Sequence, residues 1–85
     1  MFNLFLDSQP LRFLKKLDKV QRTRIWEKLD ELKSDPFPHD VKRVVGKKHK
    51  SFRVRVGEYR ILYFALLDKK EILIFKINKR SRAYN

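Results

Sequence analysis

Two short runs of alternating apolar residues, separated by a two-residue loop, constrain this chain more than any other feature of its sequence. The runs are Phe52/Val54/Val56 and Tyr59/Ile61/Tyr63. Alternation of β-branched and aromatic residues predicts two β-strands, and the Gly57-Glu58 loop predicts a tight type II′ hairpin. The predicted register pairs Val56 with Tyr59, Arg55 with Arg60, Val54 with Ile61, Arg53 with Leu62 and Phe52 with Tyr63.

The predicted hairpin gathers Arg53, Arg55 and Arg60 on one face, because residues directly opposite each other share a face. Like charges in directly opposite positions destabilise a strand pair. A small protein that nevertheless keeps Arg55 beside Arg60 is expected to hold an anion there.

The charge of the chain is concentrated in its second part. Residues 1–41 carry eight lysines and arginines against seven aspartates and glutamates, a balance of +1. Residues 42–85 carry fourteen basic residues against three acidic ones, a balance of +11, so the two parts add up to the net charge of +12. This distribution indicates a protein that binds a polyanion. Thermophile-style lysine enrichment would bring matching glutamates, which the basic part lacks.

Composition excludes several other classes of protein and site. With 85 residues, we expect one domain that spans residues 1–85. The chain has no cysteine and only two histidines, so disulfides and metal sites are not expected. It offers no carboxylate pair and no glycine-rich phosphate loop, and nothing in it calls for a cofactor. No stretch approaches the ~20 apolar residues of a membrane span, and the N-terminus lacks a basic-then-apolar leader, so we expect a soluble, cytoplasmic protein without a membrane partner.

The remaining sequence predicts an α+β fold with the element order β-α-α-β-β-β, in which a helical hairpin packs on a mostly antiparallel sheet. The expected elements are a strand over 2–6, a helix over 9–17, a second helix that begins at Asp18 and ends at Ser34-Asp35-Pro36, and strands over 51–56, 59–67 and 71–77. Asp7, Ser8 and Pro10 supply the start of the first helix, a capping side chain followed by a proline in the first turn. Asp18 with Gln21 resembles the capping box that opens the second.

The second helix has a predicted apolar stripe of Ile25, Leu29 and Leu32 at helical spacing. Trp26 lies beside this stripe, and we interpret it as a core residue rather than a nucleic-acid stacking residue.

The last strand is almost continuously apolar, which predicts a central strand covered on both faces. If it pairs with the preceding strand around Asp68-Lys69, Arg60 lies opposite Ile77. Arg80 then projects near the same end of the sheet as the arginine hairpin.

The stretch Phe52-Arg-Val-Arg-Val-Gly-Glu-Tyr-Arg60-Ile-Leu-Tyr63 and the order of elements resemble the RelE/ParE superfamily of toxins from prokaryotic toxin–antitoxin modules. The closing Lys79-Arg80-Ser81-Arg82-Ala83-Tyr84 is similar to the RelE branch, particularly its archaeal members. The likeness implies a ribosome-dependent endoribonuclease that cuts mRNA in the ribosomal A site without a metal. In that chemistry a 2′-hydroxyl attacks the adjacent phosphate and a 5′-hydroxyl leaves. The likeness also implies a RelB-like antitoxin partner, and it leaves open whether the two form a heterotetramer.

The resemblance assigns roles to individual residues. Arg60 matches the family arginine that contacts the scissile phosphate, and Arg80 matches the one that stabilises the transition state. Tyr84 matches a tyrosine that orients and stacks on the substrate. Arg53 and Arg55 stand where the best-known bacterial member has lysines. Because arginine keeps its proton in proteins, these two are expected to stabilise charge, and the general base stays open between Tyr84 and catalysis by electrostatics and positioning.

Basic segments on either side of the hairpin extend the expected surface for RNA and the ribosome. Its members are Lys47, Lys48, Lys50, Lys79 and Arg82. A merely solvated loop is an equally good interpretation of the run around His49, and we interpret that histidine as passive.

Two other functions use the same basic face. A ParE-like inhibitor of DNA gyrase would bind rather than cut RNA, and a non-catalytic RNA- or ribosome-binding protein would show salt-dependent RNA binding without cleavage. Arg80 and Tyr84 after the last strand argue against the gyrase inhibitor.

Overall fold

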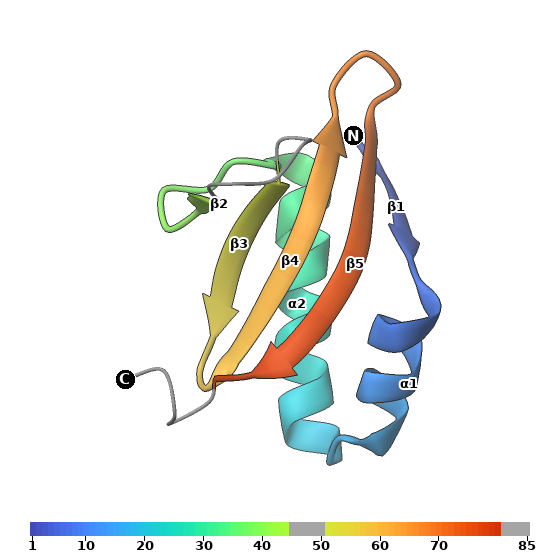
Figure 1. Ribbon diagram of the computed structural model, residues 1–85, viewed down its shortest axis with the longest axis vertical. Coiled ribbons are helices and arrows are strands. Elements are labelled where there is room, and N and C mark those ends of the chain that lie inside the picture. Colours follow the sequence, from blue (N-terminus) through green and yellow to red (C-terminus); the bar gives the residue numbers. More distant parts are fainter. Residues whose placement is uncertain (45–50, 81–85) are drawn as a thin grey trace.

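A computed structural model describes residues 1–44 and 51–80, which form two helices and a five-stranded sheet (Figure 1). Along the chain the elements are β1 (Asn3–Leu6), α1 (Ser8–Lys16), α2 (Lys19–Ser34), β2 (Lys42–Val44), β3 (Ser51–Val56), β4 (Tyr59–Leu66) and β5 (Glu71–Lys79). The strand order is β1-β5-β4-β3-β2, with β1 parallel to β5 and all other neighbours antiparallel. The predicted α+β fold with a mostly antiparallel sheet is therefore confirmed.

The strand β2, which pairs with β3 at one edge of the sheet, is not predicted by the sequence. The strand has three residues, and two of them, Lys42 and Arg43, are exposed. Short, charged edge strands discourage pairing with other chains. The same property removes the apolar alternation by which a strand is recognised in a sequence.

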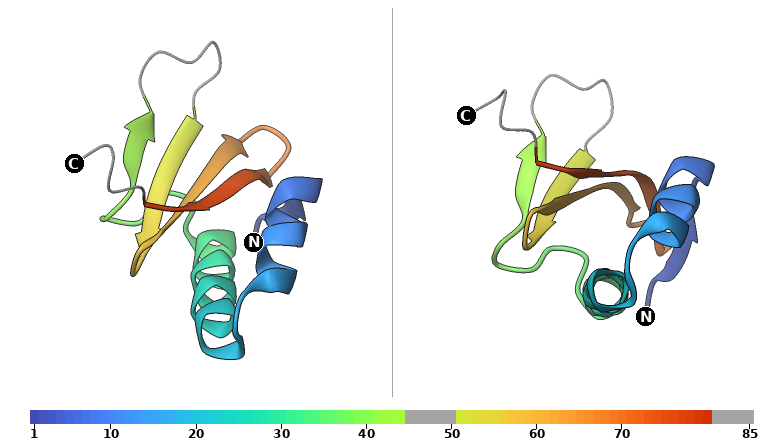
Figure 2. Two further views of the ribbon diagram at one scale, coloured as in Figure 1. Left: turned by 60° about the horizontal axis from the view of Figure 1, so that its bottom comes forward. Right: turned by 90° about the horizontal axis from the view of Figure 1, so that it is seen from below.

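Both helices lie on the same face of the sheet, which we call the inner face, and the opposite face is the outer face (Figure 2). Asp18 is the N-cap residue of α2, and its carboxylate accepts a hydrogen bond from the Gln21 amide at 3.3 Å, as the capping box predicts. Asp7 is the N-cap residue of α1, but its side chain makes no capping hydrogen bond, so that predicted role is wrong. The Asp7 amide instead donates to the Ile74 carbonyl at 3.0 Å and prolongs the pairing of β1 with β5.

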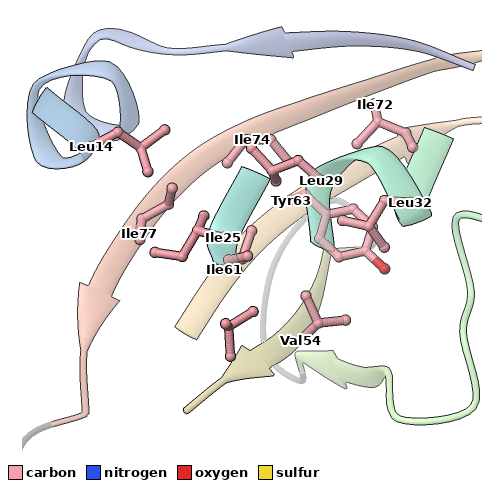
Figure 3. Close-up of a cluster of buried hydrophobic side chains, with 11 residues drawn as sticks. Leu14, Ile25, Leu29, Leu32, Val54, Ile61, Tyr63, Ile72, Ile74 and Ile77 are labelled. Atoms are coloured by element: carbon pink, nitrogen blue, oxygen red, sulfur yellow. The ribbon is translucent and has the colours of Figure 1, made fainter. Parts of the chain in front are cut away.

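The hydrophobic core lies between the helices and the inner face of the sheet (Figure 3). The predicted stripe of α2 is confirmed, since Ile25, Leu29 and Leu32 are completely buried. They face the inward side chains of the central strands: Val54, Ile61, Tyr63, Ile72, Ile74 and Ile77. Burial of these branched side chains is the main favourable contribution to folding, because it removes their apolar surface from water.

Tyr63 brings the one hydroxyl of this core cluster, and its Oη donates a hydrogen bond of 2.6 Å to the Pro36 carbonyl. The residue is completely buried. Burial raises the pKa of Tyr63, and the nearby carboxylates of Asp40 and Asp35 raise it further, so the phenol stays neutral.

Two expectations about burial are wrong. Trp26 is 38% exposed and lies at a small groove beside Leu11, rather than in the core. β5 is covered on its inner face only: Leu73 and Phe75 point to the outer face and are half-buried. Phe75 stacks on Phe64 of β4 with ring centroids 4.5 Å apart. The apolar residues on the outer face of β5 therefore pack along that face, without a covering layer from α1 or α2.

The predicted register between the last two strands is wrong, because β5 contains a β-bulge. Tyr63 pairs with Ile74 but Leu62 pairs with Lys76, so Phe75 is an additional residue on β5. As a result Arg60 lies opposite Asn78, and not opposite Ile77 as predicted. A bulge inserts one residue into one strand and shifts all later pairs by one. The shift turns Ile77 into the core, where it is completely buried.

No helix in the described ranges, 1–44 and 51–80, is long and apolar enough to cross a membrane.

Candidate functional site

The hairpin of β3 and β4 has the predicted register, with Arg55 opposite Arg60 and Arg53 opposite Leu62. Gly57 has a φ of +58°, whereas Glu58 has no positive φ, as a type II′ turn requires. A Cβ atom at Gly57 would also approach the guanidinium of Arg24 to 3.3 Å, so both conformation and space favour glycine here. The three predicted arginines therefore share the outer face of the hairpin.

The end of β5 completes the site from the neighbouring strand. The Arg60 Nε donates to the Asn78 Oδ1 at 3.2 Å, which holds the plane of the guanidinium. The Arg80 amide donates to the Glu58 carbonyl at 2.7 Å, so the residue after β5 is attached to the hairpin turn. The bulge makes this arrangement, because it places Asn78, and two residues later Arg80, on the same face as Arg60.

Gln9 of α1 anchors the same end of β5. Its Nε2 donates to the Ile77 carbonyl at 2.8 Å, and its Oε1 accepts from the Ile77 amide at 2.9 Å. β1 pairs with β5 only as far as Leu6 and Ile74. The amide of Gln9 thus replaces the strand partner that β5 has lost at this point, and it satisfies both backbone groups.

The arginines line a pocket of about 360 Å³ at this end of the sheet. Its wall is formed by Asp40, Lys42, Arg53, Val54, Arg55, Arg60 and Arg80. Four planar guanidinium groups around one concave surface can bind phosphate oxygens in pairs. Arg53 and Arg60 are half-buried, and charged contacts strengthen where the surroundings are less polar than bulk water. The geometry is that of an anion site able to stabilise charge that develops on phosphate.

Asp40 and Lys42 are members of this wall that the sequence does not predict. Lys42 comes from the missed strand β2, where it lies opposite Arg53. Asp40 lies in the turn before β2, and its carboxylate oxygens accept hydrogen bonds of 2.9 and 3.2 Å from the Lys28 Nζ of α2. This hydrogen bond lowers the pKa of Asp40 below its usual value of 3.8, with further help from the charge of Lys28. The available signal in the sequence was an isolated acid just before the basic part of the chain.

The remaining predicted residues do not reach the described pocket. Lys79 lies opposite Tyr59, and its ammonium is 3.9 Å from the carboxylate of Glu58. The other basic residues and the tyrosine lie outside the described residues: Lys47, Lys48, Lys50, Arg82 and Tyr84. Within the described ranges, no group of three or more His, Cys, Asp or Glu side chains is placed to hold a metal ion.

Comparison with known proteins gives concordant results for sequence and fold. A family model described as the ParE toxin of type II toxin–antitoxin systems, parDE, matches residues 6–84. A protein of Methanocaldococcus jannaschii that bears the name toxin RelE1 is 35% identical over 86 residues, which cover 98% of this chain and 94% of that protein.

Solved structures share the whole fold. The RelE–RelB complex of Pyrococcus horikoshii OT3 contains a chain with a TM-score of 0.84 and 29% identity, and the match covers 95% of this chain and 97% of that one. The intact E. coli RelBE toxin–antitoxin complex contains a chain with a TM-score of 0.82 over 96% of this chain and 100% of that one. At 21% identity, this second likeness concerns the fold alone.

Proposed function

The chain belongs to the ParE/RelE family of toxins from type II toxin–antitoxin systems, and from this premise we propose that it is a ribosome-dependent endoribonuclease that cuts mRNA in the A site. The observation that carries the proposal is the convergence of Arg53, Arg55, Arg60 and Arg80 on one pocket. Inhibition of translation is the expected consequence of such cleavage.

The proposed reaction is an internal displacement at phosphorus. The 2′-oxygen of the RNA forms a bond to the adjacent phosphorus, and the bond from phosphorus to the 5′-oxygen breaks. Negative charge accumulates on the oxygens in the transition state, and preorganised arginines can stabilise it. Arg60 is assigned to the scissile phosphate and Arg80 to the transition state, with Arg53 and Arg55 as further charge stabilisers. Asn78 supports this assignment, because it orients Arg60.

The ribosome supplies the ordered substrate in this proposal. Lys47, Lys48, Lys50, Lys79 and Arg82 are assigned to contacts with the phosphates of mRNA and ribosomal RNA, and Tyr84 to stacking on the substrate. Such contacts are electrostatic and fall steeply as salt increases.

A RelB-type antitoxin is the proposed protein partner. The relatives from P. horikoshii and E. coli were solved as complexes of RelE with RelB. On this chain, half-buried aromatic side chains of the outer face, Phe64 and Phe75, lie on the same sheet face as the arginine pocket. An acidic, amphipathic segment could cover the apolar part and place carboxylates among the arginines.

The experiment that tests the function is primer extension on mRNA incubated with programmed ribosomes and the purified protein. Breaks at A-site codons are expected, and none without ribosomes. The double variant Arg60→Ala/Arg80→Ala should lose activity by about 10⁴-fold or more, since each such donor contributes 10²–10³. Arg12→Ala is the matched control, because Arg12 is an exposed arginine of α1. Intact mRNA on programmed ribosomes at high concentrations of the protein would contradict the proposal. Full activity of the double variant would show that neither arginine belongs to the site.

Inhibition of DNA gyrase is a second candidate, because the matching family model carries the ParE description. A supercoiling assay with purified gyrase separates the two functions. Loss of supercoiling together with intact mRNA on ribosomes would favour the second candidate.

A further inference from the structure

The arginine pocket contains one carboxylate, that of Asp40, among the described residues of its wall. The other ionisable side chains of this wall are four arginines and one lysine. Both residue types ordinarily carry their proton at neutral pH and offer donors only. A carboxylate is ionised at this pH and is an acceptor only. The described wall therefore combines groups that stabilise negative charge with a single group that can take a proton.

We propose that Asp40 is the general base of this site, which accepts the proton of the attacking 2′-hydroxyl. The inference rests on the proposed endoribonuclease function and deepens it. A carboxylate oxygen of Asp40 removes the 2′-proton while the 2′-oxygen bonds to phosphorus. The 5′-oxygen leaves with a proton taken from water, and Asp40 returns its own proton to water. The products are a 2′,3′-cyclic phosphate and a 5′-hydroxyl, so atoms and charge balance.

The contacts of Asp40 orient its carboxylate and leave some of its acceptor positions unused. Lys28 donates to both oxygens, at 3.2 and 2.9 Å. Two carboxylate oxygens have about four acceptor positions, so each oxygen retains capacity for a substrate hydroxyl. The Lys28 side chain is only 13% exposed and also contacts Glu31 at 3.4 Å, so the cation is held firmly in α2. The Asp40 side chain is 38% exposed, which leaves it accessible to RNA.

Asp40 also lies close to the arginines by its position in the chain. It precedes Lys42 by two residues, and Lys42 lies opposite Arg53 in the sheet. A general base has to reach the hydroxyl next to the phosphate that the arginines bind. Guanidinium groups offer hydrogen-bond donors only, so the proton of the hydroxyl has to go to another residue. Asp40 provides one from a neighbouring element.

Two charged groups lower the pKa of Asp40, Lys28 on α2 and His39 beside it in the turn, whereas partial burial acts in the opposite direction. Lys42 on β2, Arg53 and Arg55 on β3, Arg60 on β4 and Arg80 after β5 share the pocket wall with Asp40. The phenol of Tyr63 on β4 also lies near Asp40 and stays neutral. The hydrogen bond from Lys28 lowers the pKa of Asp40, so the carboxylate is ionised throughout the neutral range. We therefore expect a cleavage rate that does not change between pH 6 and 9.

The sign of the effect of Asp40→Asn separates this role from a purely electrostatic one. If Asp40 only reduced the positive charge of the pocket, the neutral asparagine would strengthen RNA binding, and the cleavage rate would stay the same or increase. As the general base, its loss should slow cleavage by about 10²–10³-fold at saturating ribosomes, with apparent affinity equal or tighter. Residual cleavage should then depend on hydroxide and rise about tenfold per pH unit. Asp40→Glu should recover part of the rate.

The test is single-turnover cleavage of ribosome-bound mRNA by the full-length chain, measured from pH 6 to 9 and at several ribosome concentrations. Asp30→Asn makes the same charge change on an exposed position of α2 and should cleave within twofold of the wild type. Cleavage by Asp40→Asn within threefold of the wild type would overturn the proposal. If that variant does not fold, the wild-type profile decides, since a rate that rises steadily with pH indicates another base. Absence of cleavage by the wild-type chain would instead overturn the endoribonuclease function itself.

Discussion

The two faces of the strands β3, β4 and β5 carry opposite kinds of side chain, apolar on the inner face and cationic around the pocket on the outer face. On the inner face Ile61, Ile74 and Ile77 are completely buried under the helices. On the outer face Arg55 lies directly opposite Arg60, although like charges in that position destabilise a sheet. The inner face supplies the stability that allows the outer face to keep its arginines together. A single strand thus carries fold and site on alternate residues.

The largest difference between the two faces should appear when the same charge is placed on adjacent residues of β4. Ile61→Glu is expected to prevent folding, or to cost roughly 4 kcal/mol or more, because it buries an unpaired carboxylate. Leu62→Glu is its matched partner. Leu62 lies on the outer face between Arg53 and Lys76. We expect this second variant to change stability by less than about 1 kcal/mol. Urea unfolding followed by circular dichroism measures both, and equal losses would contradict the two-face description.

The second prediction concerns the geometry of the outer face alone. Arg60→Lys keeps the charge but loses the planar fork, so cleavage should fall about 10²-fold, while the lost hydrogen bond to Asn78 should cost no more than about 1.5 kcal/mol of stability. Single-turnover cleavage and thermal unfolding report the two quantities. Arg12→Lys on the exposed surface of α1 serves as the control and should leave both unchanged. A rate within twofold of the wild type for Arg60→Lys would show that charge alone suffices.

The third prediction concerns the polar group in the inner face. Tyr63→Phe leaves the Pro36 carbonyl without its hydrogen bond and should cost about 1–3 kcal/mol. Burial raises the pKa of Tyr63 in the folded state. The neutral phenol therefore contributes its full share to the free energy of unfolding below the unfolded pKa of about 10, and this share is lost as the pH rises above that value.

The change of stability with pH provides a second test of the role of Tyr63. The wild type should lose stability above about pH 10, and the Tyr63→Phe variant should lose less over the same range. Tyr59→Phe, at a half-buried position on the same strand, should cost less than about 0.5 kcal/mol. A Tyr63 variant as stable as the wild type at pH 7 would contradict the importance of the buried hydrogen bond.

The smallest predicted effect is a gain. Arg55→Gln removes the like-charge pair with Arg60 and should stabilise the protein by about 0.2–1 kcal/mol while it slows cleavage. The gain should shrink at high salt, because screening weakens the repulsion in the wild type. Arg43→Gln is the control, since Arg43 lies opposite Phe52 rather than another cation. Unfolding midpoints at low and high salt measure the difference, and a loss of stability would mean that Arg55 has a structural role.

Much of the fold was predictable from local patterns. The register of β3 and β4 follows from the two-residue turn and the alternation on either side of it, and all five predicted pairs are present. The stripe of α2 follows from its helical spacing. Both predictions depend on residues close together in the sequence, where geometry leaves few alternatives.

The site was predictable in part. The arginines of the hairpin were identified correctly as neighbours, and Arg80 does reach them. The register that was used to bring Arg80 there was wrong, because a bulge at Phe75 is not visible as a pattern of residues. Asp40 and Lys42 were missed, since a short charged strand and the turn before it carry no periodic signal.

Local patterns of residues are enough to show which positions alternate, where the tight turn lies and how charge is divided between the two parts of the chain. Packing between distant segments sets which polar side chains accompany the arginines. β5 must bury Ile77 against the helices and at the same time stack Phe75 on Phe64, and a bulge satisfies both. That requirement arises from packing between distant segments, and it places Asn78 beside Arg60 and Arg80 at the pocket.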